Sequence, residues 1–141
     1  MTSDQNKAAS KHLLELWGDN ALHQPTNFLS TDYVNHQHPD AGGGTSSLTL
    51  EAWKGLVADF HAAFSDVRME VLLQVAEADL VCSRWRMTAK HTGSFRGGPA
   101  ATGRTTTWTG VHTDRYEAGT LVESWVDWDK ASFLEGLGLT I

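Results

Sequence analysis

Residues 108–129, WTGVHTDRYEAGTLVESWVDWD, contain the pattern that decides the fold. Two runs rich in threonine, valine and aromatic residues, 105–116 and 120–129, flank the short sequence Glu-Ala-Gly at 117–119. Such residues suit a pleated, half-buried sheet, and the glycine permits the positive φ that a tight turn needs. The stretch therefore predicts an antiparallel β-hairpin whose tip lies at Ala118 and Gly119.

The position of this tip predicts which residues of the two strands lie opposite one another. Gly110 should face Asp127, and His112 should face Trp125. All four share one side of the sheet, because alternate side chains of a strand point to the same face. His112 and Asp127 are then diagonal neighbours, about 7–8 Å apart at the backbone and within side-chain reach. A carboxylate among tryptophans, opposite a glycine that leaves space and near an imidazole, indicates an acid/base site.

Length and composition narrow the class of protein. The 141 residues suit a single domain over 1–141. A net charge of −6 without a basic run argues against nucleic-acid binding. No apolar run approaches the roughly 20 residues of a membrane span, and the first ten residues lack the apolar core of a signal peptide, so we expect a cytoplasmic protein. The single cysteine, Cys82, can form neither an internal disulfide nor a cysteine-based zinc site.

The remaining segments divide into a helical first half and a strand-rich second half. Residues 23–47 are rich in turn-forming residues, with a glycine-rich run at 42–47, and are interpreted as irregular. The order predicts an α+β fold with helices on one face of a curved antiparallel sheet. The expected elements are a helix over 4–22 ending near 18–20, a helix capped by Thr49 and ended by Ser65 and Asp66, strands over 68–76 and 79–91, the hairpin, and a closing helix over 130–137.

Several loose motifs occur in a recognisable order along residues 10–138. They are Tyr-Val-Asn at 33–35, His-Thr-Gly-Ser-Phe at 91–95, Gly-Pro at 98–99, Thr-Gly-Arg at 102–104, the single residues His112, Arg115 and Gly119, Asp-Trp at 127–128 and Leu-Gly at 137–138. In this order and spacing the chain resembles the SnoaL-like polyketide cyclases, a branch of the nuclear-transport-factor-2-like superfamily. The sequence Asn-His-Gln-His-Pro at 35–39 and the pair Ser124 and Trp125 depart from the commoner versions of the family.

The resemblance implies a cone: a strongly bent antiparallel sheet with helices packed on the concave side around a pocket. It also implies an enzyme without metal or organic cofactor, in which an aspartate of the last strand serves as acid/base in an intramolecular aldol ring closure. A histidine of the preceding strand lines the same pocket. The matching residues are Asp127 and His112, the pair that the hairpin register brings together independently. Isomerase, hydratase, hydroxylation and epoxide-opening roles stay open, as does a noncatalytic ligand-binding or assembly domain.

The chemistry expected of this pair depends on burial. An apolar surrounding would raise the pKa of Asp127 toward the useful range, and His112 could then donate to the developing oxyanion. Asp129 precedes the closing helix, so capping is favoured over a role in the pocket. For His91, pocket wall and core are equally open. The expected partner is a small apolar or aromatic ligand, and the candidate substrate-binding residues are Trp108, Trp125, His91, Asn35, Asp129 and Trp85.

Two further features concern metals and oligomers. His36, His38 and Asp40 invite a metal interpretation, but their spacing matches no known zinc motif, so solvated loop histidines are favoured and no metal is predicted. One face of the strand over 79–91 combines arginines with Cys82 and Thr88. Such a face suits a polar-rimmed contact between two copies, so we expect a homodimer.

Overall fold

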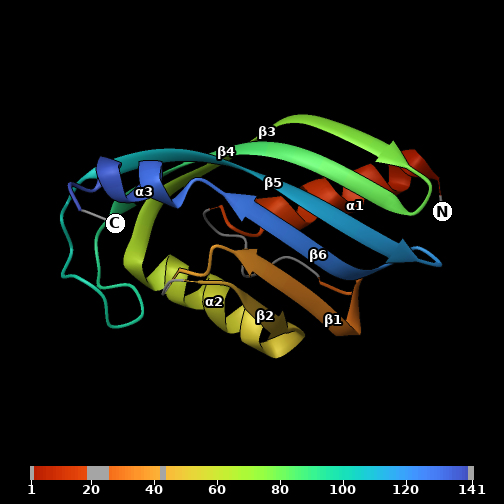
Figure 1. Cartoon of the computed structure of the whole chain (residues 1–141), viewed down its shortest axis with the longest axis horizontal. Helices are drawn as coiled ribbons and strands as arrows, with labels where there is room; N and C mark the ends of the chain where they lie inside the picture. Colours follow the sequence, from red (N-terminus) through yellow and green to blue (C-terminus); the bar gives the residue numbers. More distant parts are fainter. Residues whose placement is uncertain (1, 19–25, 42–43, 140–141) are drawn as a thin grey trace.

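A single six-stranded sheet organises the molecule (Figure 1). The computed structural model describes residues 2–18, 26–41 and 44–139. The end of the first predicted helix, 19–22, and two glycines of the predicted loop, 42–43, lie outside these residues. In spatial order the strands are β2 (Ser46–Thr49), β1 (Leu29–His38), β6 (Thr120–Trp128), β5 (Thr105–Glu117), β4 (Leu80–His91) and β3 (Phe64–Glu77).

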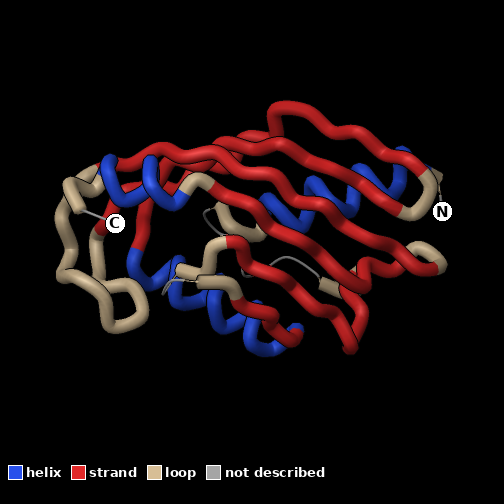
Figure 2. The backbone as a smooth tube through the Cα atoms, viewed as in Figure 1, coloured by secondary structure: helices blue, strands red, loops and turns tan. Residues whose placement is uncertain are grey.

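Three helices complete the α+β fold and confirm the fold class that the sequence predicts. They are α1 (Ser3–Glu15), α2 (Leu50–Ala63) and α3 (Lys130–Gly136). The curved sheet bends around its inner side, where α1 contacts β3 and β4 and α2 contacts β1, β2 and β3 (Figure 2). The predicted caps are confirmed: Thr49 accepts a hydrogen bond from the amide of Ala52, and Asp129 accepts one from the amide of Ser132. Both caps satisfy amides that lack a partner within the helix.

The sheet is mixed, because β1 lies parallel to β6 while the other neighbouring strands are antiparallel. All of β1 and the first half of β2 fall in the segment 23–47 that is interpreted as irregular from the sequence, and that interpretation is wrong. The alternation in β1 is carried by Tyr33, Asn35 and Gln37, which point inward and are buried. Two of these three are amides, so a search for alternating apolar residues does not detect the strand.

The β5–β6 hairpin turns at the predicted tip, where Ala118 and Gly119 both have positive φ. Its register changes at a β-bulge. Near the tip Glu117 pairs with Thr120, as predicted, but Arg115 pairs with Glu123, so one residue of β6 has no partner. A shift of one residue turns every later side chain to the other face. The predicted register is therefore wrong beyond the bulge.

The bulge fixes the inner and outer faces of β6. Ser124 and Val126 point inward and are buried, whereas Asp127 is exposed. His112 lies opposite Val126 instead of Trp125, and Gly110 lies opposite Trp128 instead of Asp127.

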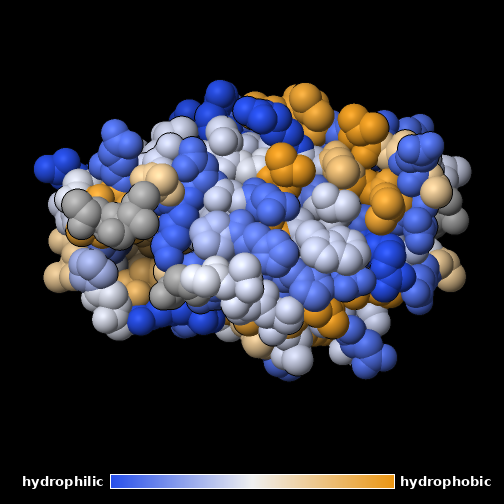
Figure 3. All heavy atoms as spheres, viewed as in Figure 1, coloured by the Kyte–Doolittle hydropathy of each residue, from blue (hydrophilic) through white to orange (hydrophobic). Residues whose placement is uncertain are grey.

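The face of the molecule seen in Figure 3 is largely hydrophilic, with apolar side chains gathered over β3 and β4. Four large apolar residues are exposed there: Leu72, Leu73, Val75 and Leu80. No helix within the described ranges is long and apolar enough to cross a membrane.

Candidate functional site

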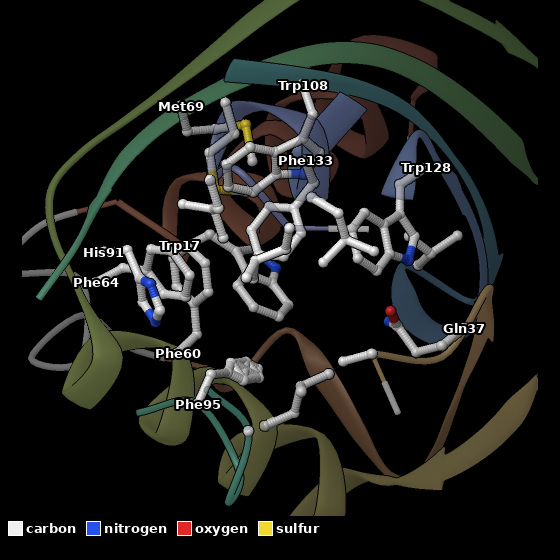
Figure 4. Close-up of a pocket in the computed structure, with 18 of the residues that line it drawn as sticks. Trp17, Gln37, Phe60, Phe64, Met69, His91, Phe95, Trp108, Trp128 and Phe133 are labelled. Carbon is white, nitrogen blue, oxygen red and sulfur yellow. The ribbon is translucent and has the colours of Figure 1, made fainter. Parts of the chain in front are cut away.

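A cavity of about 180 Å³ lies between the inner face of the sheet and the helices (Figure 4). Its walls come from the sheet, from α2 and the residues after α1, from the loop that follows β4, and from α3 and the residues after it. Most of these side chains are aromatic or aliphatic. They are Trp17, Gln37, Ala41, Leu56, Phe60, Phe64, Met69, Trp85, Met87, His91, Phe95, Gly98, Pro99, Trp108, His112, Val126, Trp128, Phe133, Leu134, Leu137 and Leu139.

The described lining contains few polar groups. Besides indole nitrogens, only Gln37, His91 and His112 bring polar side chains to it, and none of the described lining residues is Asp, Glu, Lys or Arg. A charged ligand would lose its hydration without gaining an ionic partner at this wall, which is costly. The cavity therefore suits an uncharged, flat and largely apolar molecule.

His112 is fixed as a neutral hydrogen-bond donor. It projects inward from β5 with 3% of its surface exposed, and burial lowers its pKa to about 3. The indole Nε1 of Trp85 lies 2.8 Å from His112 Nδ1. An indole N–H can only donate, so Nδ1 accepts and the single hydrogen of the neutral imidazole is on Nε2. His112 thus offers an Nε2–H group at the cavity wall.

Gly110 makes room for the indole of Trp85. A Cβ added at Gly110 would overlap the six-membered ring of Trp85 and lie 2.8 Å from the carbonyl oxygen of Asp127. The sequence predicts open space at this glycine, and that interpretation is wrong, because the indole occupies it. Gly110 instead lets Trp85 lie flat enough over β5 to reach His112, with the two ring centroids 5.9 Å apart.

His91 also lines the cavity, at the far end of β4, where its ring stacks on Phe64 with centroids 5.1 Å apart. Its Nδ1 accepts from the backbone amide of Thr102 at 3.1 Å. In the neutral form its hydrogen is therefore also on Nε2. His112 pairs with Ser83, which lies eight residues before His91 on β4, so the two donors sit toward opposite ends of the cavity.

Asp127 and Trp125 lie outside the cavity, which corrects the site predicted from the hairpin. The side chain of Asp127 is 66% exposed, and its carboxylate lies 3.8 Å from Nδ1 of His38. Trp125 stacks on His36 on the outer face, with centroids 5.5 Å apart and an interplanar angle of 16°. The cause is the bulge, which turns both residues away from the inner face. Asp127 therefore cannot act on a molecule held in the cavity in this geometry.

The other predicted residues are distributed as follows. Trp108 and Trp85 line the cavity, whereas Asn35 is fully buried behind Gln37 and Asp129 is exposed at the start of α3. Hydrogen bonds from the hydroxyl and amide of Ser132 lower the pKa of Asp129. Asp129 is thus a helix cap. The roles of Trp108, Trp85, His91 and His112 toward a ligand remain predictions.

Asp114, a buried carboxylate on β5, was not among the predicted site residues. It has no exposed surface, and Ser124 Oγ donates to its Oδ1 at 2.6 Å. Burial raises its pKa to about 6. The signal was available, because Asp114 has the same strand parity as Trp108 and His112. Gln37 was also missed, since β1 itself was not recognised.

The outer face of the sheet carries a group of ionic interactions. His36 Nε2 lies 2.7 Å from Glu123, and Arg115 bridges Glu123 and Glu117 at 3.1 and 2.7 Å. The hydrogen bond from His36 is the main cause of the lowered pKa of Glu123. Within the part of the chain that is described, no three His, Cys, Asp or Glu side chains gather so that they could hold a metal ion.

The fold and the cavity agree with sequence comparison. A profile of the SnoaL-like polyketide cyclases matches residues 7–137, so the protein belongs to this family. A comparison with curated proteins found no similar sequence.

Solved structures give the same architecture. AclR from Streptomyces galilaeus, a candidate hydroxylase, is 27% identical with a TM-score of 0.81, and the match covers 97% of this chain and 98% of AclR. IdmH from Streptomyces antibioticus, a candidate polyketide cyclase, is 28% identical with a TM-score of 0.77, covering 96% and 99%. A SnoaL-like protein from a Jannaschia species is 16% identical with a TM-score of 0.80, covering 96% and 92%, and this similarity shows the fold alone.

Proposed function

We propose that this chain binds an uncharged, polycyclic carbonyl compound of the polyketide type and promotes its closure by an intramolecular aldol reaction. The observation that carries the proposal is the fixed Nε2–H donor of His112 in an apolar, aromatic cavity. Family membership and the similarity to IdmH support the reaction class. In line with the family resemblance, the proposal includes no metal or organic cofactor.

In an aldol closure the α-carbon of one carbonyl group attacks the carbon of another, and negative charge develops on the attacked oxygen. A donor aimed at that oxygen stabilises the transition state more than the ground state. His112 suits this role because a histidine with a pKa of about 3 stays neutral and keeps its N–H at working pH. The same low pKa makes it a weak base.

The protein's second contribution is to hold the flexible substrate folded. Aromatic walls favour the compact conformer in which the reacting carbons approach one another, and such positioning alone can lower a barrier substantially. The α-proton passes to water, because no carboxylate occurs in the described lining, and the product alkoxide takes a proton back from water. Asp127 has no part in this scheme.

A noncatalytic ligand-binding role is the second candidate. The observation that favours it is the same lack of a carboxylate in the described lining, because a binding site needs no proton acceptor. A hydroxylation step is a third use of such a cavity, given the 27% identity to AclR.

Turnover of aromatic polyketide intermediates, followed by mass spectrometry of the products, separates these candidates. His112→Leu removes the donor and should lower the rate about 10²–10³-fold. His112→Gln should retain much of it, because its amide can accept from Trp85 and still donate to the ligand. Asp127→Asn is the matched control and should leave the rate unchanged.

A rate that survives in His112→Leu, or disappears in Asp127→Asn, would contradict the assignment. Tight binding of every tested intermediate without any product would favour the noncatalytic role.

A further inference from the structure

We propose that Gln37 is the specificity-determining acceptor of the cavity, with its amide oxygen turned toward the ligand by a buried hydrogen-bond chain that runs through Asn35 to Tyr33. The inference rests on the proposed function only in requiring that a ligand occupies the cavity. It does not require turnover.

Gln37 belongs to the same row of the sheet as the donor His112. Val126 pairs with His112 on one side and with Gln37 on the other. Gln37 is 6% exposed and lines the cavity, and its oxygen points into the open space between the aromatic walls (Figure 4). A donor and an acceptor thus flank the apolar side chain of Val126 on the concave wall.

A chain of side chains runs from Gln37 away from the cavity. Gln37 Nε2 donates to Asn35 Oδ1 at 2.5 Å, and Asn35 Nδ2 donates to the hydroxyl of Tyr33 at 2.8 Å. Next to Asn35, on β6, Ser124 Oγ donates to Asp114 Oδ1 at 2.6 Å. Asp114, Ser124 and Asn35 lie side by side on three neighbouring strands.

The tyrosine hydroxyl at the buried end of this chain fixes its direction. Tyr33 accepts the Nδ2 hydrogen of Asn35, so the nitrogen of that amide is taken. Asn35 then has its oxygen left as the group that faces Gln37.

The orientations of the two amide groups, of Asn35 and Gln37, follow from this. Asn35 has to turn its nitrogen to Tyr33 and its oxygen to Gln37. Gln37 therefore turns its nitrogen to Asn35, which leaves its oxygen for the ligand. Tyr33 and Asn35 are positioning residues for an acceptor that they do not themselves present, and both side chains are fully buried or nearly so.

The resulting site selects for one chemical feature. A ligand carbonyl can accept from His112, and a ligand hydroxyl can donate to Gln37. A compound of the same shape without a hydroxyl leaves the buried amide oxygen unpaired, which costs about 1–3 kcal/mol, or roughly five- to a hundredfold in affinity. The cavity should therefore prefer carbonyl compounds that also carry a hydroxyl group.

The test uses three probes of one ring system: anthraquinone, 2-hydroxyanthraquinone and 2-methoxyanthraquinone. The methoxy group fills similar space but cannot donate. Quenching of the lining tryptophans, Trp17, Trp85, Trp108 and Trp128, reports the binding of each. We expect the parent protein to bind the hydroxy compound about tenfold more tightly than the methoxy compound.

Variants test whether Gln37 and the hydrogen-bond chain behind it cause the preference for the hydroxyl compound. Gln37→Leu should abolish it while anthraquinone still binds. Tyr33→Phe should reduce it toward unity at unchanged anthraquinone affinity, because Asn35 loses the acceptor of its nitrogen and its amide no longer has a fixed direction. Loss of folding alone would lower the affinity for all three probes together, so the ratio distinguishes positioning from damage.

Binding without a preference for the hydroxyl, or a preference that survives in Gln37→Leu, would overturn the inference and leave the proposed function intact. Failure of all three quinones to bind would overturn both. If His112→Leu loses turnover but keeps the hydroxyl preference, the catalytic role of His112 and the specificity role of Gln37 are separate.

Discussion

The inner and outer faces of the β5–β6 hairpin carry opposite kinds of polar chemistry. On the outer face Arg115, Glu123 and Glu117 are ionised and paired where water reaches them. On the inner face His112 and Ser124 act as neutral groups with defined hydrogen-bond directions. The difference shows that water access, more than residue type, decides which polar groups serve a cavity of this kind.

Asp114 and His112, both on the inner face, have pKa values that burial shifts in opposite directions. They are two residues apart on β5, and burial acts on both. It raises the pKa of Asp114 to about 6 and lowers that of His112 to about 3. Both shifts favour the neutral form, as expected where charges lose their hydration.

Exchange of Val126 and Asp127 should have the largest effect. The double variant Val126→Asp/Asp127→Val places a carboxylate on the buried inner face and a valine on the exposed outer face. Burying an unpaired carboxylate should cost more than about 4 kcal/mol of unfolding free energy. Urea denaturation measures this. Asp127→Val alone is the control and should cost about 1 kcal/mol or less, and equal stabilities of the double variant and the parent would contradict our account of the two faces.

Gly110→Ala should have the next largest effect. The added methyl group overlaps the ring of Trp85, so the ring must move away from His112. Overpacking of this kind costs about 1–3 kcal/mol. Gly55→Ala is a matched control, because nothing lies within 4 Å of the added Cβ on α2, and it should be neutral or stabilising. Thermal unfolding compares the two variants. An unchanged melting temperature of Gly110→Ala would show that Trp85 is not held as described.

Asp114 and His112 predict opposite slopes of stability with pH. The folded protein retains the Asp114 proton up to about pH 6, whereas the unfolded chain loses it near 3.8. This contribution to stability is present below pH 3.8 and disappears as the pH rises through 6. For His112 the pKa is 6.5 in the unfolded chain and about 3 in the folded protein. Its contribution to stability is therefore present above pH 6.5 and disappears as the pH falls toward 3.

Asp114→Asn should therefore steepen the rise of unfolding free energy between pH 4 and 6. The added rise should approach about 3 kcal/mol, since each unit of pKa shift corresponds to roughly 1.4 kcal/mol. Urea titrations at several pH values test this. A pH dependence identical to that of the parent protein would show that Asp114 titrates normally.

The smallest effect concerns assembly. We expect the exposed apolar side chains on β3 and β4, with Arg84 and Arg86 beside them, to form a contact between two copies. Light scattering at micromolar concentration should report a dimer. Val75→Lys, at a position that is 61% exposed, should weaken it without unfolding the protein. A monomer in the parent protein would contradict the expectation.

The sequence predicted much of the fold because the decisive signals are local. Alternation in 79–91, the capping residues Thr49 and Asp129, and the glycine of the hairpin tip each act over a few residues. The bulge has no comparable signal, since nothing in 120–129 marks Val122 as unpaired. One undetected residue was enough to place Asp127 and Trp125 on the wrong face.

The cavity was predictable only in part. His112, Trp108 and Trp85 followed from strand parity, whereas Gln37 depended on recognising β1, whose buried residues are mostly polar. The bond between Trp85 and His112 joins two strands, and Gly110 opens its path. Such relations appear only when three strands are placed side by side.

The protonation state of His112 tests the central claim most directly. Two-dimensional NMR that correlates the ring protons with the ring nitrogens distinguishes the neutral tautomers from the imidazolium. We predict that His112 Nε2 carries the hydrogen and Nδ1 accepts, and that this pattern persists unchanged from pH 8 to pH 5. An imidazolium already formed at pH 5, or a hydrogen on Nδ1, would contradict the role of His112 as the neutral donor of the cavity.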